Sequence, residues 1–224
     1  MVKIANIRIN RKRMLTLSNS NKERNIYAHP FFIARDIFWQ RLERVFDYLA
    51  RSTNKTDNVL DFGGGSGVFC KALSQLYNKI TIIDLDTEEV ENIIQHYHLD
   101  NVECVNSDIN KYTSKEKYDV IIATDVLEHF KDLSEPLNFF KKFLAYNGLL
   151  IVTLPTENKL YEVGRRIINK KKPIDHFHKS KDVVAFLQKH GFEIIESSYI
   201  PKYIIHIPLF EFVAFKYKGN SKDT

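Results

Sequence analysis

The sequence NVLDFGGGSGVFCKAL, residues Asn58 to Leu73, constrains the fold of this chain more than any other segment. An apolar, β-branched run ends at Asp61, glycine fills four of the five positions from Gly63 to Gly67, and a helix-compatible stretch follows. This order of strand, glycine turn and helix brings backbone N–H groups and a helix N-terminus close to a bound ligand. Because side chains would block that approach, glycine is needed there. The segment therefore predicts a cofactor-binding crevice.

The net charge of +5 is concentrated near the N-terminus. Residues Met1 to Arg24 hold seven basic side chains and one acidic side chain, whereas the remaining 200 residues carry a net charge of about −1. We predict a basic N-terminal arm over residues 1–24 and a single domain over residues 25–224. A solvated arm is one interpretation, and an arm that contacts nucleic acid or anionic lipid is the other. The domain itself offers no electrostatic case for nucleic acid.

Cysteine content and hydropathy indicate a cytoplasmic protein. The two cysteines, Cys70 and Cys104, lack the spacing of metal ligands, which favours a reduced environment. No apolar run approaches the roughly 20 residues that a membrane-spanning helix needs. The N-terminus also lacks the apolar core of a signal peptide. We therefore expect no membrane span; the oligomeric state cannot be derived from these patterns.

Helical and strand-like patterns alternate along the rest of the chain. The helical patterns fall at Tyr27–Arg51, Ser66–Tyr77, Thr87–Tyr97, Ser134–Ala145 and Lys181–His190. The strand-like runs fall at Val59–Asp61, Lys79–Asp84, Val102–Asn106, Tyr118–Ala123, Leu149–Leu154, Phe192–Tyr199 and Leu209–Tyr217. Alternation at this spacing predicts βαβ crossovers around a parallel sheet, and hence one doubly wound α/β domain.

The residues around the glycine turn discriminate between two cofactors. Asp84 ends the second predicted strand, 21 positions after Gly63, where a carboxylate can accept hydrogen bonds from a ribose diol. NAD would use the same arrangement, but its fingerprint requires a small residue where this chain has Val68. Asp61 would repel a pyrophosphate and suit a ligand that carries an ammonium group. These features favour S-adenosylmethionine, with NAD as the rival.

The ordered set of motifs resembles the class I S-adenosylmethionine-dependent methyltransferases. DFGGGSG at Asp61–Gly67 matches the D-x-G-x-G-x-G motif of that family at every fixed position. IIDLD at Ile82–Asp86, NSDI at Asn106–Ile109 and the segments Tyr118–Phe130 and Asn147–Pro155 resemble the later motifs. The resemblance implies a three-layer, doubly wound, Rossmann-like fold. Its mostly parallel, seven-stranded sheet would have an antiparallel last strand.

The resemblance also implies which residues bind the cofactor. It assigns the methionine part to Asp61 and the glycine turn, the ribose to Asp84, and the adenine to Asp108 and the backbone of Ile109. The complete predicted set is Asp61, Gly63, Gly65, Gly67, Asp84, Asp108, Ile109 and Asp125. For Asp84 and Asp108 a loop or helix-capping role is the structural alternative.

Three polar residues after the fourth strand are candidates for the chemistry. Asp125, Glu128 and His129 have the i, i+3, i+4 spacing of one helical face. His129, assisted by Glu128, is our candidate general base, because an unperturbed imidazole titrates near neutrality. A capping box formed by Asp125 and Glu128 is the structural alternative.

Metal binding is a second alternative at the same segment. The resemblance implies that family members with an E-x-x-E-H segment hold a divalent metal there, but Asp125 replaces the first glutamate, so we assign no metal ligand. The resemblance allows a later histidine, His176 or His178, to complete such a site; a polar loop ahead of the next helix is the other interpretation of these two residues.

We therefore predict a methyltransferase that moves a methyl group from S-adenosylmethionine to a small-molecule hydroxyl or amine. Two alternatives belong to other classes. One is an RNA methyltransferase that uses the basic arm and a metal. The other is a non-catalytic protein that keeps the methyltransferase fold as a partner of an active enzyme.

Overall fold

The computed structural model describes residues 27, 30–158, 176–201 and 208–219. The basic arm predicted over residues 1–24 lies outside these ranges. The chain divides into two compact units, Met1–Asn106 and Ser107–Thr224. Seven strands form a sheet with the order β3-β2-β1-β4-β5-β7-β6. The predicted fold class is confirmed: β1 pairs in parallel with β2, β2 with β3 and β4 with β5, while β7 runs antiparallel to both β5 and β6.

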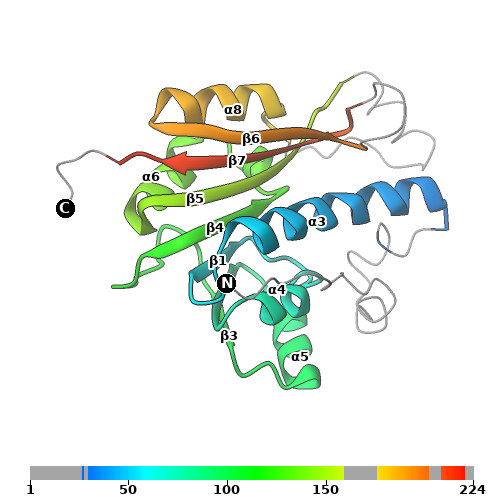
Figure 1. Ribbon diagram of the computed structural model, residues 1–224, viewed down its shortest axis with the longest axis vertical. Helices are drawn as coiled ribbons and strands as arrows, with labels where there is room; N and C mark the ends of the chain where they lie inside the picture. Colours follow the sequence, from blue (N-terminus) through cyan, green and yellow to red (C-terminus); the bar gives the residue numbers. More distant parts are fainter. Residues whose placement is uncertain (1–26, 28–29, 159–175, 202–207, 220–224) are drawn as a thin grey trace. The chain divides into compact units, whose positions relative to one another are not determined.

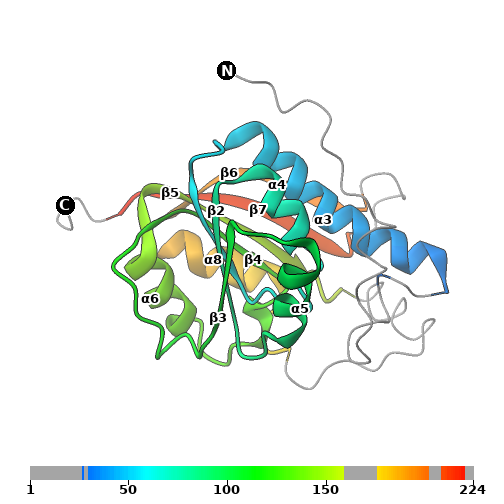
Figure 2. The same cartoon turned by 90° about the horizontal axis from the view of Figure 1, so that it is seen from below.

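The described part of the first unit consists of three helices and three parallel strands. Its elements are α3 (Phe32–Ser52), β1 (Asn58–Phe62), α4 (Cys70–Leu76), β2 (Lys79–Asp84), α5 (Glu88–Tyr97) and β3 (Val102–Asn106). Strands β1 and β2 are buried along nearly their whole length, as expected for strands covered on both faces. Helices α4 and α5 lie next to each other in this unit (Figure 2).

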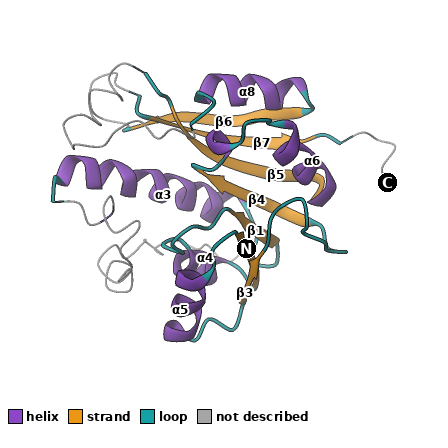
Figure 3. Ribbon diagram, turned by 180° about the vertical axis from the view of Figure 1, so that it is seen from behind, coloured by secondary structure: helices purple, strands orange, loops and turns teal. Residues whose placement is uncertain are grey.

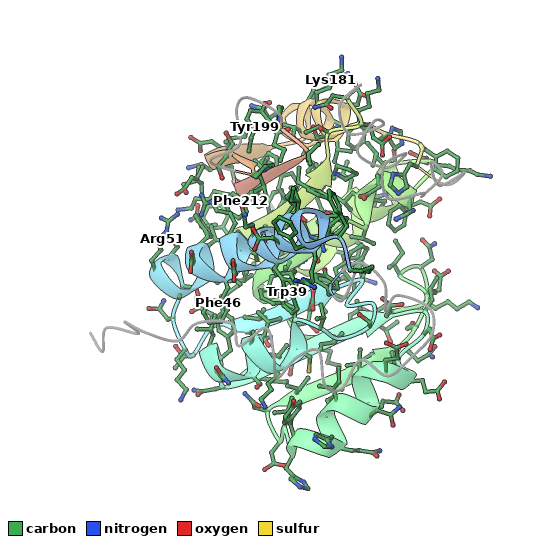
Figure 4. The ribbon with its side chains drawn as sticks, turned by 90° about the vertical axis from the view of Figure 1, so that its right-hand side faces the viewer. Trp39, Phe46, Arg51, Lys181, Tyr199 and Phe212 are labelled. Carbon is green, nitrogen blue, oxygen red and sulfur yellow. The ribbon has the colours of Figure 1, made fainter. Side chains whose placement is uncertain are left out.

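Helix α3 is amphipathic and turns a wide apolar face inward. Figure 4 shows Trp39 and Phe46 on this helix, and both side chains are about 1% exposed. Arg51 lies in the last turn, where a positive charge interacts favourably with the helix dipole. The indole N–H of Trp39 donates a hydrogen bond of 3.1 Å to the carbonyl of Tyr27, so residue 27 is anchored just ahead of the helix.

The second unit contains the other four strands. Its described elements are β4 (Tyr118–Thr124), the 3₁₀ turn η1 (Leu127–His129), α6 (Ser134–Phe143), β5 (Leu144–Pro155), α8 (Ser180–Lys189), β6 (Phe192–Ile200) and β7 (Phe210–Tyr217). In Figure 1 strands β5, β7 and β6 lie side by side, with α8 against β6 and β7. Lys181 in α8 and Tyr199 on β6 are exposed, whereas Phe212 on β7 is buried (Figure 4).

Helix α4 begins later than the sequence pattern predicts, because the glycine turn continues to Gly67. The N–H of Gly67 donates to the carbonyl of Gly64 at 3.0 Å, and the N–H of Cys70 donates to the carbonyl of Gly67 at 3.0 Å. Gly64 is needed for packing, since a Cβ at this position would overlap the Cγ2 atom of Ile82 on β2. The glycine turn and β2 are therefore in direct contact.

We expect Gly64→Ala to destabilise the protein by about 1–3 kcal/mol, because an extra methyl group would be forced into a filled space. Urea unfolding followed by circular dichroism would measure the change. Ser66→Ala, in the same turn, is the matched control and should have little effect. Removing the Cγ2 atom with Ile82→Ala should reduce the Gly64→Ala penalty; equal penalties in both backgrounds would contradict the steric explanation.

Candidate functional site

The glycine turn of the first unit is built from left-handed backbone and two hydrogen bonds to β2. Gly63, Gly65 and Gly67 have φ angles of 73°, 53° and 68°, a region that residues with a Cβ rarely adopt. The N–H of Gly63 donates to the carbonyl of Ile83 at 2.8 Å, and the N–H of Gly65 donates to Oδ2 of Asp84 at 2.8 Å. The turn is therefore held against the end of β2.

Asp61 lies on β1 directly before this turn and is 2% exposed. Its Oδ1 atom is buried and has no hydrogen-bond partner among the described residues. Burial, and secondarily the charge of Asp84, raises the pKa of Asp61 from 3.8 to about 7. A buried carboxylate of this kind suits a ligand with a positive group, since a cation would stabilise the ionised form.

Asp84 ends β2 and has a partly structural role. Oδ2 accepts the Gly65 N–H and Oδ1 accepts the Asp86 N–H at 3.1 Å, so the orientation of the carboxylate is fixed. Each carboxylate oxygen can accept more than one hydrogen bond, so both remain able to accept from ribose hydroxyls. The structure thus brings Asp61, Asp84 and the glycine turn together in the first unit, as predicted.

Asp108 and Ile109 belong to the second unit, in the turn that follows β3. Asp108 is exposed and its Oδ1 accepts the N–H of Asn110 at 2.7 Å, which is the local capping role that the sequence left open. Ile109 is half-buried. The assignment of these two residues to adenine binding stays a prediction.

The helical face predicted after β4 is wrong. Asp125 has a left-handed φ of 51°, and only the three residues Leu127–His129 form a 3₁₀ turn, so the chain between β4 and α6 is largely loop (Figure 3). The capping box is also wrong: Val126 precedes the turn and no side chain caps it. Asp125 instead accepts a hydrogen bond of 2.8 Å from the hydroxyl of Thr153 on β5.

A cluster of titratable side chains nevertheless forms in the second unit. Glu128, His129 and His176 each place one potential ligand atom within 4.8 Å of the others. The rings of His129 and His176 meet edge to face, with 4.7 Å between their centroids. Glu128 is 1% exposed, while His129 is exposed. Of the two late histidines only His176 joins this cluster; Nε2 of His178 lies 3.4 Å from the carbonyl of Lys131.

The sequence patterns did not identify Glu157, which contacts the same cluster. Its Oε1 lies 2.8 Å from Nδ1 of His176, and the residue is 3% exposed. Glu157 follows β5 by two residues, so it lies where parallel strands usually present functional groups. The position of Glu157 just after a strand end is therefore the sequence signal that could have identified it.

The cluster can accept a proton or bind a cation. Two imidazoles and a carboxylate are ligands that suit a divalent transition metal such as Zn²⁺ better than Ca²⁺. The proximity of the three ligand atoms supports this fit. A divalent cation at Glu128, His129 and His176 is therefore chemically compatible with the residues present.

The glycine turn with its buried carboxylate, on a seven-stranded sheet with antiparallel β7, defines the class I methyltransferase architecture. A family model described as "Methyltransferase domain" matches residues 33–197. The chain belongs to this family, and the predicted resemblance is confirmed. The methyl donor of the family is S-adenosylmethionine, which decides against the NAD rival.

Curated relatives match about half of the chain. A ubiquinone biosynthesis O-methyltransferase of Rickettsia akari is 26% identical over 126 residues, which cover 55% of this chain and 50% of that protein. An (S)-coclaurine N-methyltransferase of Thalictrum flavum subsp. glaucum is 30% identical over 100 residues, 42% of this chain and 28% of that protein. The chain thus spans half or less of the length of these relatives.

A solved structure extends the similarity in fold to nearly the whole chain. The N-methyltransferase NodS of Bradyrhizobium japonicum WM9 in complex with S-adenosylhomocysteine has a TM-score of 0.67 and 17% sequence identity. The alignment covers 93% of this chain and 98% of that one.

None of the described helices combines the length and the apolar composition that a membrane crossing requires.

We expect the stability of the cofactor-free protein to fall with rising pH because of Asp61. The unfolded chain loses the Asp61 proton near pH 3.8, whereas the folded chain keeps it to about pH 7. Between these values wild type should lose up to about 1.4 kcal/mol of unfolding free energy per pH unit relative to Asp61→Asn. Above pH 7 the difference should become constant.

Urea unfolding of both proteins at pH 5, 6, 7 and 8 would measure this effect. Taking the difference between the two proteins cancels the titration of other groups. Parallel pH profiles for wild type and Asp61→Asn would contradict a buried carboxyl group with a raised pKa.

Proposed function

We propose that this protein transfers a methyl group from S-adenosylmethionine to a hydroxyl or amine of a small molecule. The observation that carries the proposal is the buried Asp61 carboxylate beside the glycine turn. S-adenosylmethionine carries both an ammonium and a sulfonium group, so it offers the positive charge that this carboxylate requires. Asp84, already oriented by two backbone N–H groups, would bind the ribose.

Methyl transfer is an in-line displacement at carbon. The acceptor oxygen or nitrogen forms a bond to the methyl carbon while the carbon–sulfur bond breaks, and S-adenosylhomocysteine leaves with the electron pair. Much of the rate enhancement in such a reaction comes from positioning and exclusion of water. The acceptor must also lose a proton. His129 accepts this proton as the general base, and Glu128 precedes it in the same 3₁₀ turn.

A small-molecule acceptor is supported by what the relatives are named for. One relative is named as an O-methyltransferase of ubiquinone biosynthesis and another as an (S)-coclaurine N-methyltransferase, and both names refer to small molecules. RNA methylation would depend on the arm at residues 1–24, because the remaining chain carries about −1 net charge. A non-catalytic role would require that the cluster of Glu128, His129 and His176 takes no part in a reaction.

Cation-assisted transfer is a second candidate for the mechanism. The specific observation that favours it is the grouping of Glu128, His129 and His176. These three residues would hold the ion. When bound, a divalent cation would lower the pKa of an acceptor hydroxyl.

We expect the protein to bind S-adenosylhomocysteine and to methylate members of a panel of phenols, catechols and amines. His129→Ala should lower kcat by about 10²–10⁴-fold with little change in cofactor affinity, because a general base acts only on the acceptor. Mass spectrometry of the methylated product and calorimetry with S-adenosylhomocysteine would measure the two effects. His96→Ala, exposed on α5, is the control histidine. Absence of cofactor binding would refute the proposal.

Chelation distinguishes the two mechanisms. We expect dialysis against EDTA to leave the rate unchanged if His129 acts as a base alone. Cation-assisted transfer instead predicts that the rate falls to the level of His129→Ala and recovers when Mn²⁺ or Zn²⁺ is added. Recovery in wild type without recovery in His176→Ala would assign the ion to this cluster.

A further inference from the structure

Glu157 combines three features that seldom occur together in one residue. It is 3% exposed, it has a left-handed backbone with φ of 50°, and it contacts a histidine. A left-handed conformation disfavours a residue with a Cβ, and burial disfavours a carboxylate. Unfavourable features of this kind persist where the surroundings enforce them, and they concentrate at functional sites.

The neighbours of Glu157 enforce its conformation. The side chain of Thr156 donates a hydrogen bond of 2.6 Å to the carbonyl of Pro208, and the Nδ2 group of Asn158 donates one of 2.5 Å to the same carbonyl. The N–H of Thr156 also donates to the carbonyl of Leu209 at 3.0 Å. Residue 157 is thus held between two anchored neighbours, and its side chain reaches His176.

The contact with Glu157 favours a proton on Nδ1 of His176 over one on Nε2. Oε1 of an ionised Glu157 can only accept, so Nδ1 of His176, 2.8 Å away, must donate. In the neutral ring the lone pair then lies on Nε2, on the other side of the imidazole. The contact therefore selects one tautomer as well as one ring orientation.

A second contact holds the other side of the same segment. The N–H of Phe177 donates a hydrogen bond of 2.8 Å to the carbonyl of Glu128. This bond joins the residue after His176 to the turn that carries Glu128 and His129, and the two imidazole rings meet edge to face. His176 is therefore fixed between Glu157 on one side and the η1 turn on the other.

We propose that Glu157 is a positioning residue that holds His176, next to Glu128 and His129, in the Nδ1–H tautomer. Stability alone does not account for Glu157, because a buried carboxylate is costly and well-packed apolar side chains are often at least as stabilising as buried charged groups. A carboxylate behind a histidine is, however, the usual means of fixing the tautomer of an imidazole that acts as ligand or base. The effect of Glu157 on catalysis rests on the proposed methyltransferase function, whereas the tautomer of His176 does not.

The tautomer is tested directly by NMR of protein labelled with ¹⁵N at histidine, recorded at rising pH until the ring of His176 is neutral. His176→Gln assigns the signal by its disappearance. We expect the neutral ring of wild type to carry its proton on Nδ1 and Glu157→Ala to show a mixture of tautomers. His190 is the internal control, because its Nδ1 contacts the carbonyl of Phe186 at 2.8 Å and should be unaffected. A neutral wild-type ring protonated on Nε2 would overturn the proposal, whatever becomes of the variant.

Kinetics test the functional consequence. We expect Glu157→Ala to lower kcat for methyl transfer by about 10–100-fold, the range typical of an outer-shell partner of a histidine. Glu157→Asp, which keeps the charge, should recover part of the loss. The affinity for S-adenosylhomocysteine should stay within about twofold of wild type. Unchanged kcat in Glu157→Ala would overturn the positioning role. Absence of transfer by wild type would instead refute the proposed function and leave the NMR result standing.

Discussion

The close contact between the glycine turn and β2 is the constraint on which the cofactor side depends. Two hydrogen bonds, from Gly63 to the carbonyl of Ile83 and from Gly65 to Asp84, hold the turn in place. This contact requires left-handed backbone and leaves no room for a Cβ at Gly64. It also brings the Asp61 and Asp84 carboxylates near enough for the charge of Asp84 to raise the pKa of Asp61. The turn therefore creates an electrostatic cost that a bound cationic group would offset.

Much of the fold could be predicted from the sequence because its signals are local. Buried parallel strands appear as apolar runs, and the register of β1 and β2, with Asp61 opposite Ile82, leaves the glycine turn and Asp84 together at the strand ends. Local sequence patterns misplace the ends of a helix or strand where tertiary contacts determine those ends. Helix α4 starts at Cys70 because residues 64–70 first complete the turn, a feature that apolar periodicity cannot register.

The grouping of Glu128, His129 and His176 was harder to predict because its geometry is not local. The i, i+3, i+4 spacing of Asp125, Glu128 and His129 assumes a continuous helix, whereas the hydroxyl of Thr153, 28 residues away, holds Asp125 in a left-handed turn. Glu128, His129 and His176 still come together, but through the backbone bond between Phe177 and Glu128. A single sequence contains the residues of this cluster without the long-range contacts that assemble it.

The left-handed residues Asp125 and Glu157 connect the strain in the second unit to its chemistry. Each follows the end of a parallel strand, β4 or β5, and each has its carboxylate hydrogen-bonded to a side chain from a distant segment of the chain. Backbone strain costs about 1–3 kcal/mol per residue, so two strained carboxylates on neighbouring strands are a substantial burden for a marginally stable domain. If stability alone governed these positions, glycine or asparagine would relieve the strain. At position 157, however, a carboxylate is needed to fix the imidazole of His176 through a hydrogen bond. The backbone strain at Glu157 is therefore explained by its role in orienting His176.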